Sequence, residues 1–201
     1  MPKTSDLPLP KQARARATYR ALMLAAAEQL AEGGLEALTS NGIVARAGLS
    51  PPAFYRYFRD KFDILQRLAR ELMQAQNDQI APMLQSQTLD LPALIALLRA
   101  TVDVTRDYPG GAALLRAMRA DPQLQAIRLD SHRGVAAGLA RQLNGLNLDL
   151  SDEAAYRRAR LAVEMGYAAV ELIFEDPPDN ESDILKQTAR AILALADAPE
   201  S

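Results

Sequence analysis

Apolar residues recur along most of the chain at the three- and four-residue spacing of helices. No segment alternates apolar and polar residues over the length of a strand, and alanine and leucine, which favour helices, dominate the sequence. The first such stripe lies between residues 16 and 32 and comprises Tyr19, Leu22, Met23, Ala26 and Leu30, with Gly33-Gly34 as the expected stop. The pattern predicts an all-α fold with about nine helices.

Capping residues, glycine and proline mark the expected helix boundaries. Thr39 or Ser40 is predicted to cap a short helix that reaches Arg46 and is closed by Gly48. Ser50 is predicted to cap a third helix that begins with two prolines and ends near residues 59–60. Later helices are expected at about 61–80, 90–108, 121–144, 151–176 and 182–196, with no internal repeat or flexible linker.

Residues 38–61 have the length and turn chemistry of a helix-turn-helix. A helix is about as wide as the major groove of DNA, so a rigid pair of helices can present one of them to base edges while the other braces it. Phe54 and Phe58 are expected to pack beneath that helix as core residues.

A more specific pattern covers residues 16–68. It consists of Ala45, the run Ala47-Gly48-Leu49-Ser50, the run Phe54-Tyr55-Arg56-Tyr57-Phe58 and Lys61-Phe62, accompanied by Ala26, Gly34, Leu38, Thr39 and Ile43. With these residues the chain resembles the TetR family of transcriptional regulators. The resemblance implies a basic tail (1–15), a three-helix DNA-binding domain (16–62) and a helical effector-binding and dimerisation domain (63–201).

The resemblance also implies which side chains contact DNA. The residues expected at base edges are Asn41, Pro51, Pro52, Ala53 and Arg56, and those expected at phosphates are Thr39, Tyr55, Tyr57 and Lys61. The two prolines and Ala53 offer only apolar surface, which suits thymine methyl groups. Asn41 and Arg56 are therefore the predicted hydrogen-bonding readers of adenine and guanine. Gly42 is expected to loosen the second helix, since glycine costs about 1 kcal/mol relative to alanine there.

Charge is distributed unevenly along the chain. Up to Ala75 there are 11 Lys and Arg against 7 Asp and Glu, whereas the remainder has 12 against 18. A basic front part suits a module that binds a polyanion. The basic residues Lys11, Arg14, Arg16 and Arg20 either reach the DNA backbone or belong to a solvated terminus.

The C-terminal part carries signs of helix packing and of a ligand site. Small residues at Ala155, Ala159, Ala162, Gly166 and Ala169 let another helix approach closely. With the last helix they resemble the family's homodimer interface, although a monomer's own core would leave the same pattern. The polar groups considered for a small-molecule effector are Asp103, His132, Glu164 and Tyr167. The plainer alternatives are that Glu164 pairs with Arg160 and that His132, next to Ser131, lies at the surface.

Other function classes lack their chemistry in this sequence. There is no cysteine and only one histidine, acidic residues are dispersed, and no glycine loop is followed by Lys-Ser/Thr, so neither a metal nor another cofactor is expected. The N-terminus does not resemble a secretory signal and no apolar run approaches the roughly 20 residues of a membrane span, which predicts a cytoplasmic protein.

The leading hypothesis is a homodimeric repressor. It would bind a pseudo-palindromic operator whose half-sites lie about 34–36 Å or a multiple of that distance apart, and a small-molecule effector would release it, with the helix that starts at Lys61 as the lever. A helical enzyme is one alternative, but no nucleophile and base can be paired. The other alternative is an interaction module that has kept the fold but lost DNA binding. Gly42 and the two prolines are the residues that favour this alternative.

Overall fold

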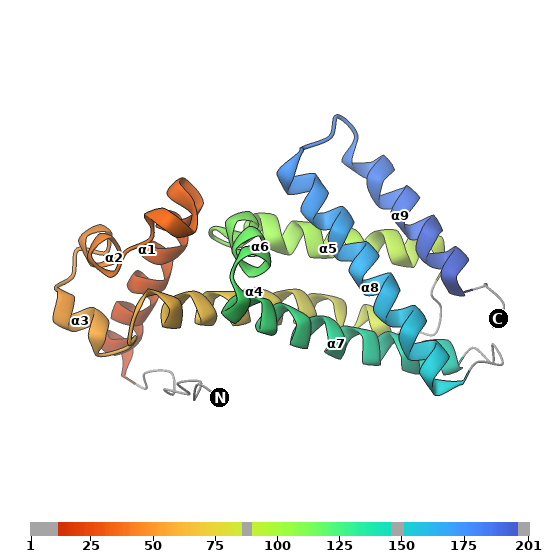
Figure 1. The fold of residues 1–201 in the computed structure, drawn as a ribbon, viewed down its shortest axis with the longest axis horizontal. Coiled ribbons are helices and arrows are strands. Elements are labelled where there is room, and N and C mark those ends of the chain that lie inside the picture. The colour runs from red at the N-terminus through yellow and green to blue at the C-terminus, as the bar shows by residue number, and fades with distance from the viewer. Residues whose placement is uncertain (1–11, 86–89, 146–150, 197–201) are drawn as a thin grey trace. The chain divides into compact units, whose positions relative to one another are not determined.

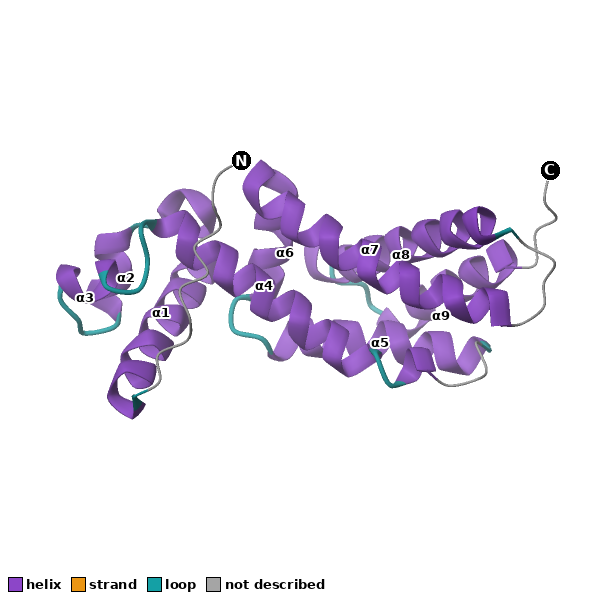
Figure 2. Cartoon of the chain, turned by 90° about the horizontal axis from the view of Figure 1, so that it is seen from below, coloured by secondary structure: helices purple, strands orange, loops and turns teal. Residues whose placement is uncertain are grey.

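The protein, seen in a computed structural model, is described at residues 12–85, 90–145 and 151–196, where it is helical and has no strand (Figures 1 and 2). The predicted all-α fold is confirmed. The helices in these ranges are α1 (Ala13–Ala37), α2 (Ser40–Arg46), α3 (Pro51–Tyr55), α4 (Lys61–Ile80), the short 3-10 helix η1 (Met83–Gln85), α5 (Leu91–Asp107), α6 (Gly111–Ala120), α7 (Pro122–Gly145), α8 (Asp152–Glu175) and α9 (Glu181–Ala196).

The helices divide into two compact units. Unit 1 comprises Met1–Glu71 and Tyr108–Gln125, and unit 2 comprises Leu72–Asp107 and Ala126–Ser201. Helices α4 and α7 each contribute residues to both units. The boundary expected after residue 62 stays a prediction, because the first compact unit extends further along α4 and also includes α6.

Several predicted caps hold the first turns of their helices. The hydroxyl of Thr39 accepts a hydrogen bond from the backbone N–H of Gly42 (3.0 Å), and Asp90 Oδ1 accepts one from the N–H of Ala93 (2.9 Å). Ser151 Oγ accepts from the third N–H of α8 (3.2 Å). These side chains satisfy amide donors that lack a partner within the helix, so short sequence motifs specify where α2, α5 and α8 begin.

Three elements differ from their expected bounds. Helix α1 extends to Ala37, past the predicted stop, although Gly34 interrupts its helical geometry with φ +69° and ψ −169°. Helix α3 ends at Tyr55, about one turn earlier than expected. Helix α6 is not among the predicted helices. Its ten residues lie between a pair of glycines and an Asp-Pro pair, and each of these pairs predicts a helix boundary.

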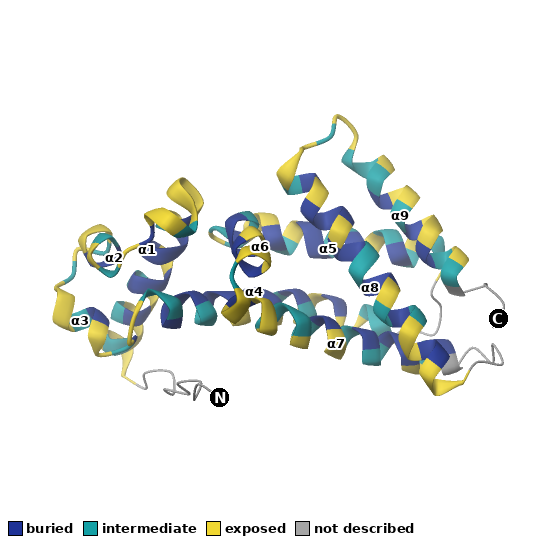
Figure 3. Cartoon of the chain, viewed as in Figure 1, coloured by how far each residue is buried: buried dark blue, intermediate teal, exposed yellow. Residues whose placement is uncertain are grey.

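The core of unit 1 is built around aromatic rings. Phe54 and Phe58 are fully buried, as predicted, with ring centroids 5.5 Å apart, and Tyr19 of α1 stacks on Phe58 at 5.3 Å. Stacked and tilted ring pairs add to the free energy gained from burial. Figure 3 shows both buried and exposed positions on α1. Phe54 therefore fixes one face of α3 in this core, whereas Tyr55 is exposed.

Helix α8 forms the centre of unit 2, where it packs against α5 and α9. The small residues predicted to allow close helix approach are all buried inside the chain: Ala155, Ala159, Ala162, Gly166 and Ala169. A Cβ added at Gly166 would lie 3.0 Å from Leu98 Cδ2 of α5. The small-residue stripe thus packs within the chain's own core, which is one of the two alternatives that the sequence left open, and a homodimer through the two C-terminal helices stays a prediction.

Candidate functional site

Helices α2 and α3 and the residue that follows α3 carry the side chains predicted to read bases. Asn41, Pro51, Pro52 and Arg56 are exposed, and Ala53 is half-buried. Tyr55 is 60% exposed although its ring contacts the buried Phe54 (centroids 5.4 Å apart). The predicted base-reading residues are therefore accessible or partly accessible, and their role at DNA stays a prediction.

Tyr57 and Lys61, which are also predicted to contact phosphates, already have partners within the protein. Tyr57 is half-buried and packs edge-on against Tyr19 (centroids 6.2 Å apart), with the guanidinium of Arg56 5.9 Å from its ring centre. Lys61 Nζ donates a hydrogen bond to the carbonyl of Leu38 (3.1 Å). An ammonium has three donors, so this bond leaves Lys61 able to meet a phosphate while fixing the start of α4 against the entry to α2.

A side chain of α1 holds the beginning of α2. Gln29 Oε1 accepts a hydrogen bond from the backbone N–H of Thr39 (3.1 Å), the residue that caps α2. A Cβ built at Gly42 would lie 2.1 Å from Gln29 Nε2, so glycine leaves the room this side chain needs. The sequence suggested only that Gly42 loosens α2; the structure gives it a packing role against α1.

Helix α2 is also tied to α1 by charge. Arg46 forms ion pairs with Glu32 and with Glu28, the latter at 3.5 Å. The hydrogen bonds from Arg46 lower the pKa of the Glu32 carboxyl below its ordinary value. Exposed pairs of this kind contribute little stability, so their main effect is to orient α2.

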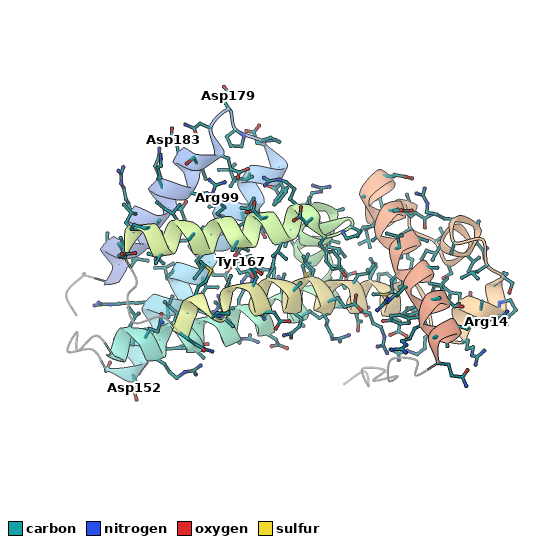
Figure 4. The ribbon with its side chains drawn as sticks, turned by 180° about the vertical axis from the view of Figure 1, so that it is seen from behind. Arg14, Arg99, Asp152, Tyr167, Asp179 and Asp183 are labelled. Atoms are coloured by element: carbon teal, nitrogen blue, oxygen red, sulfur yellow. The ribbon has the colours of Figure 1, made fainter. Side chains whose placement is uncertain are left out.

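The basic residues before and within α1 are only partly described. Lys11 lies outside the described residues, as does most of the predicted tail 1–15. Arg14, Arg16 and Arg20 are exposed on α1, with Arg14 at its first turn (Figure 4). Their contact with DNA stays a prediction.

In unit 2, three of the four proposed effector groups lie together. Nδ1 of His132 lies 2.9 Å from Oε1 of Glu164, and the His132 ring stacks on Tyr167 with centroids 3.8 Å apart. His132 is 0% exposed, so its expected surface position was wrong. Asp103 lies apart, exposed on α5 and paired with Arg106 at 3.2 Å.

Glu164 is the centre of a charged cluster. It pairs with Arg160, as the sequence predicted, and with Arg128 at 3.5 Å. Burial alone would raise the pKa of the Glu164 carboxyl, but hydrogen bonds from His132 and Arg160 bring it below its ordinary value. Burial lowers the pKa of the His132 imidazole. His132 is therefore neutral at pH 7 and donates Nδ1–H to the carboxylate, which leaves Nε2 as an acceptor without a hydrogen-bond partner among the described residues.

Sequence reasoning missed a second buried polar group beside this cluster. Tyr167 donates its hydroxyl to Gln76 Oε1 (2.9 Å), and Gln76 Nε2 donates to Thr105 Oγ1 (2.7 Å). Burial raises the pKa of the Tyr167 hydroxyl. The sequence signal that could have found it is a polar residue in line with an apolar helical stripe, as Thr105 is with Leu98 and Val102 of α5.

A cavity adjoins Tyr167 inside unit 2. It has a volume of about 50 Å³ and is lined mainly by leucine and valine side chains, such as Leu94 and Leu98 of α5 and Val163 of α8. Figure 4 shows Tyr167 in the interior of the helices. Apolar space next to a few polar groups is typical of small-molecule sites in proteins.

Comparison with known proteins identifies the family. The sequence model described as bacterial regulatory proteins, tetR family, matches residues 22–68. The model described as the tetracyclin repressor-like C-terminal domain matches residues 92–195, which is more than half of the chain. The chain belongs to the TetR family. It is a helix-turn-helix transcriptional regulator, and α2 and α3 are the two helices of that motif.

Solved TetR-family structures share the fold at low sequence identity. A Syntrophomonas wolfei protein assigned to the family has a TM-score of 0.72 at 13% identity, with 90% of this chain and 95% of that chain covered. GusR of Salmonella enterica has a TM-score of 0.70 at 18% identity, with coverages of 92% and 100%. A TetR-like regulator from Rhodococcus sp. RHA1 has a TM-score of 0.66 at 18% identity, with coverages of 88% and 96%. No curated protein matches the chain.

Two kinds of feature are absent from the described residues of this TetR-family chain. In the described ranges, no helix is long and apolar enough to cross a membrane. Over the same residues, no three His, Asp or Glu side chains are grouped so that they could hold a metal ion.

Proposed function

We propose that the protein is a homodimeric repressor that binds a pseudo-palindromic operator and is released from it by a small-molecule effector. The observation that carries this proposal is the two-sided construction of α3. Its Phe54 is fixed in the core, whereas Tyr55 and the following Arg56 are exposed, as is Asn41 of α2. A stiff, short helix with one face anchored is what entry into the major groove requires. Such a repressor works in the cytoplasm, with the DNA.

Base reading is assigned to Arg56 and Asn41. Arg56 is exposed and can present its planar guanidinium to the O6 and N7 of guanine, while an asparagine amide matches the N6 and N7 of adenine. Phosphate contacts are assigned to Thr39, Tyr55, Tyr57 and Lys61. Pro51 and Pro52 have no backbone N–H at the start of α3, so side chains carry the anchoring, and their apolar rings and Ala53 suit thymine methyl groups.

The test is DNA binding with a matched pair of variants. A duplex selected by the protein from a random pool, and DNA upstream of its own gene, would be titrated beside random DNA at physiological salt. We expect Arg56→Ala to weaken binding to the selected duplex by about tenfold to a hundredfold, since a bidentate base contact contributes roughly 1–3 kcal/mol, and to relax preference at one base pair.

Arg133→Ala is the control, because Arg133 is an exposed arginine of unit 2 paired with Asp130. It removes the same charge and should leave both affinities unchanged. Equal weakening of Arg56→Ala on selected and random DNA would refute base reading. No duplex bound more tightly than random DNA would refute the operator function and favour an interaction module. Affinity should also fall steeply as salt rises, because several phosphates are contacted.

Dimerisation is assigned to exposed apolar residues on α8 and α9. Leu161 and Leu172 of α8 are about half exposed, and Ala168 between them is exposed as well. The spacing places them on one face of the helix. Ala191 and the half-buried Leu195 continue an apolar face on α9. Water-exposed leucines on one helix face are stabilised when a second copy covers them.

Effector binding is assigned to the cavity of unit 2 and the polar groups beside it. Tyr167 lines the cavity, and the His132 ring stacks on the Tyr167 ring. Glu164 lies next to His132, to which it is hydrogen-bonded. Asp103 is exposed and paired elsewhere, so the proposal does not include it. An effector that binds one conformer more tightly than another would shift the population away from the DNA-binding form.

A further inference from the structure

The wall of the cavity shows what kind of molecule it can hold. Helices α4, α5, α7, α8 and α9 and the short η1 all contribute to it, and no charged side chain is among the lining residues. Its aliphatic side chains include Leu94, Leu98, Val135, Leu139 and Val170. Such a surface gains free energy only by replacing water or empty space with apolar atoms.

The two polar side chains that line the cavity are already satisfied. Thr101 Oγ1 donates to the carbonyl of Leu97 (3.1 Å), and the Tyr167 hydroxyl donates to Gln76 (2.9 Å). A charged ligand group inside the cavity would therefore meet no counterion and no free donor. Burying an unpaired charge in this way is costly.

The charged cluster of unit 2 does not change this conclusion. Glu164 is held by Arg160, Arg128 and His132, and none of these four residues lines the cavity. The ring of His132 lies flat against the ring of Tyr167, 3.8 Å between centroids, and it is Tyr167 that faces the cavity.

The size of the cavity limits how much of a ligand it can hold. About 50 Å³ is one third of the roughly 150 Å³ apolar cavity known to hold benzene. We propose that the effector fills this cavity with an uncharged aliphatic group rather than with a charged group. This inference rests on the proposed effector function of unit 2 and adds the chemical class of the ligand.

The experiment uses a homologous series of soluble probes and the full-length protein. Binding of n-butanol, n-pentanol and n-hexanol would be measured by calorimetry and thermal unfolding. We expect affinity to rise roughly fourfold for each added CH₂, the increment for burying one methylene. Hexanoate and hexylamine should bind at least about tenfold more weakly than n-hexanol, because their charge has no partner in the wall.

A filled cavity gives the matched variant. Ala162 lines the cavity, so Ala162→Leu should abolish n-hexanol binding, whereas Ala96→Leu on the exposed face of α5 should leave it unchanged. If Ala162→Leu failed to fold, the probe series alone would still decide. Affinity independent of chain length, or charged probes that bind as tightly as n-hexanol, would each overturn the inference.

DNA titration separates this inference from the proposed function. Alkyl probes that bind in the expected order while the protein ignores every selected duplex would support the cavity assignment and refute the repressor. Tight operator binding without any alkyl binding would refute the ligand class and leave the repressor intact. If n-hexanol lowers the operator affinity of the unsubstituted protein but not that of Ala162→Leu, the result would support both the repressor function and the ligand class.

A second, independent observation concerns Gln29. This residue belongs to α1, yet its side chain accepts the backbone N–H of Thr39 and occupies the space that glycine leaves at position 42. We infer that Gln29 is a positioning residue for DNA recognition. It fixes the first turn of α2, the turn that carries Asn41, without itself lying on the exposed α2 and α3 surface.

The test compares three substitutions by their ratio of specific to random DNA affinity. Gln29→Met keeps the length of the side chain but removes the acceptor, and we expect it to lower the ratio about fivefold, the equivalent of one net hydrogen bond. Gln29→Glu keeps an acceptor oxygen and should restore the ratio, since its added charge weakens both affinities alike. An unchanged ratio in Gln29→Met, or no rescue by Gln29→Glu, would overturn the inference. A purely structural role would change the thermal midpoint and not the ratio.

Discussion

Gly110 is a position where a single added methyl group would meet the backbone of another helix of unit 1. It precedes α6 with φ +68° and ψ 16°, a left-handed conformation. A Cβ added there would lie 2.6 Å from the carbonyl oxygen of Ala27 and 3.2 Å from its carbonyl carbon. These atoms belong to the backbone of α1, so they cannot rotate away as the end of a side chain could.

Two costs add up in Gly110→Ala. The left-handed conformation costs a residue with a Cβ about 1–2 kcal/mol, and the forced contact adds about 1–3 kcal/mol, as overpacking typically does. We expect a loss of about 2–5 kcal/mol in the free energy of unfolding. The control is Gly48→Ala, because Gly48 has φ +65° but a Cβ there would have no neighbour within 4 Å. It should lose only the backbone cost.

Urea unfolding of both variants measures the difference. It would be followed by circular dichroism at one protein concentration, because association would otherwise shift the midpoints. The difference between the two variants isolates the contact between the α6 start and α1. Equal losses for Gly110→Ala and Gly48→Ala would refute the reasoning, since they would mean that α1 yields to the extra methyl group at no cost.

Three further predictions follow from other parts of the structure. Phe54→Ala should lower the free energy of unfolding by about 3–5 kcal/mol, because a fully buried ring leaves a cavity; a loss below 1 kcal/mol in urea unfolding would contradict its core role. Leu172→Arg should convert the protein to a monomer in sedimentation at micromolar concentration, whereas Ala96→Arg should not; an unchanged dimer would contradict the assigned interface. The free energy of unfolding should fall as the pH drops below about 6.5, because the His132 imidazole, buried against Glu164, Arg128, Arg160 and Tyr167, binds a proton less readily in the folded protein than in the unfolded chain. His132→Asn should therefore make the urea midpoint depend less on pH between pH 5 and 7, and an unchanged dependence would contradict this prediction.

The sequence predicted those parts of the molecule whose structure is decided by near neighbours. Thr39 caps α2 through an amide three residues away, and Phe54 and Phe58 meet across one turn. Such motifs hold within a few residues, so they could be placed without knowing the fold. With Phe54 and Phe58 buried, the intervening Tyr55 and Arg56 are left exposed.

Features decided by distant parts of the chain were harder to predict. The small residues of α8 suit another helix, but only the fold shows that α5 and α9 of the same chain take that place. Helix propensity is a local property, and on that basis alone Gly42 is predicted to destabilise α2. The side chain that fills its space comes from Gln29, and the sequence offers no local sign of that contact.

The position of His132 depends both on its near neighbours in the sequence and on distant parts of the chain. Its neighbour Ser131 and the charged residues nearby suggested the surface, yet its partners Glu164 and Tyr167 come from α8, more than thirty residues away. The helix period still carried information, because Val135, Ala136 and Leu139 follow it at three-, four- and seven-residue spacing and are half or fully buried. A polar residue in line with such a stripe is buried whenever the stripe is, and burial obliges it to find a partner. Periodicity can therefore predict that a polar side chain is buried and paired, but the identity of the partner requires the fold.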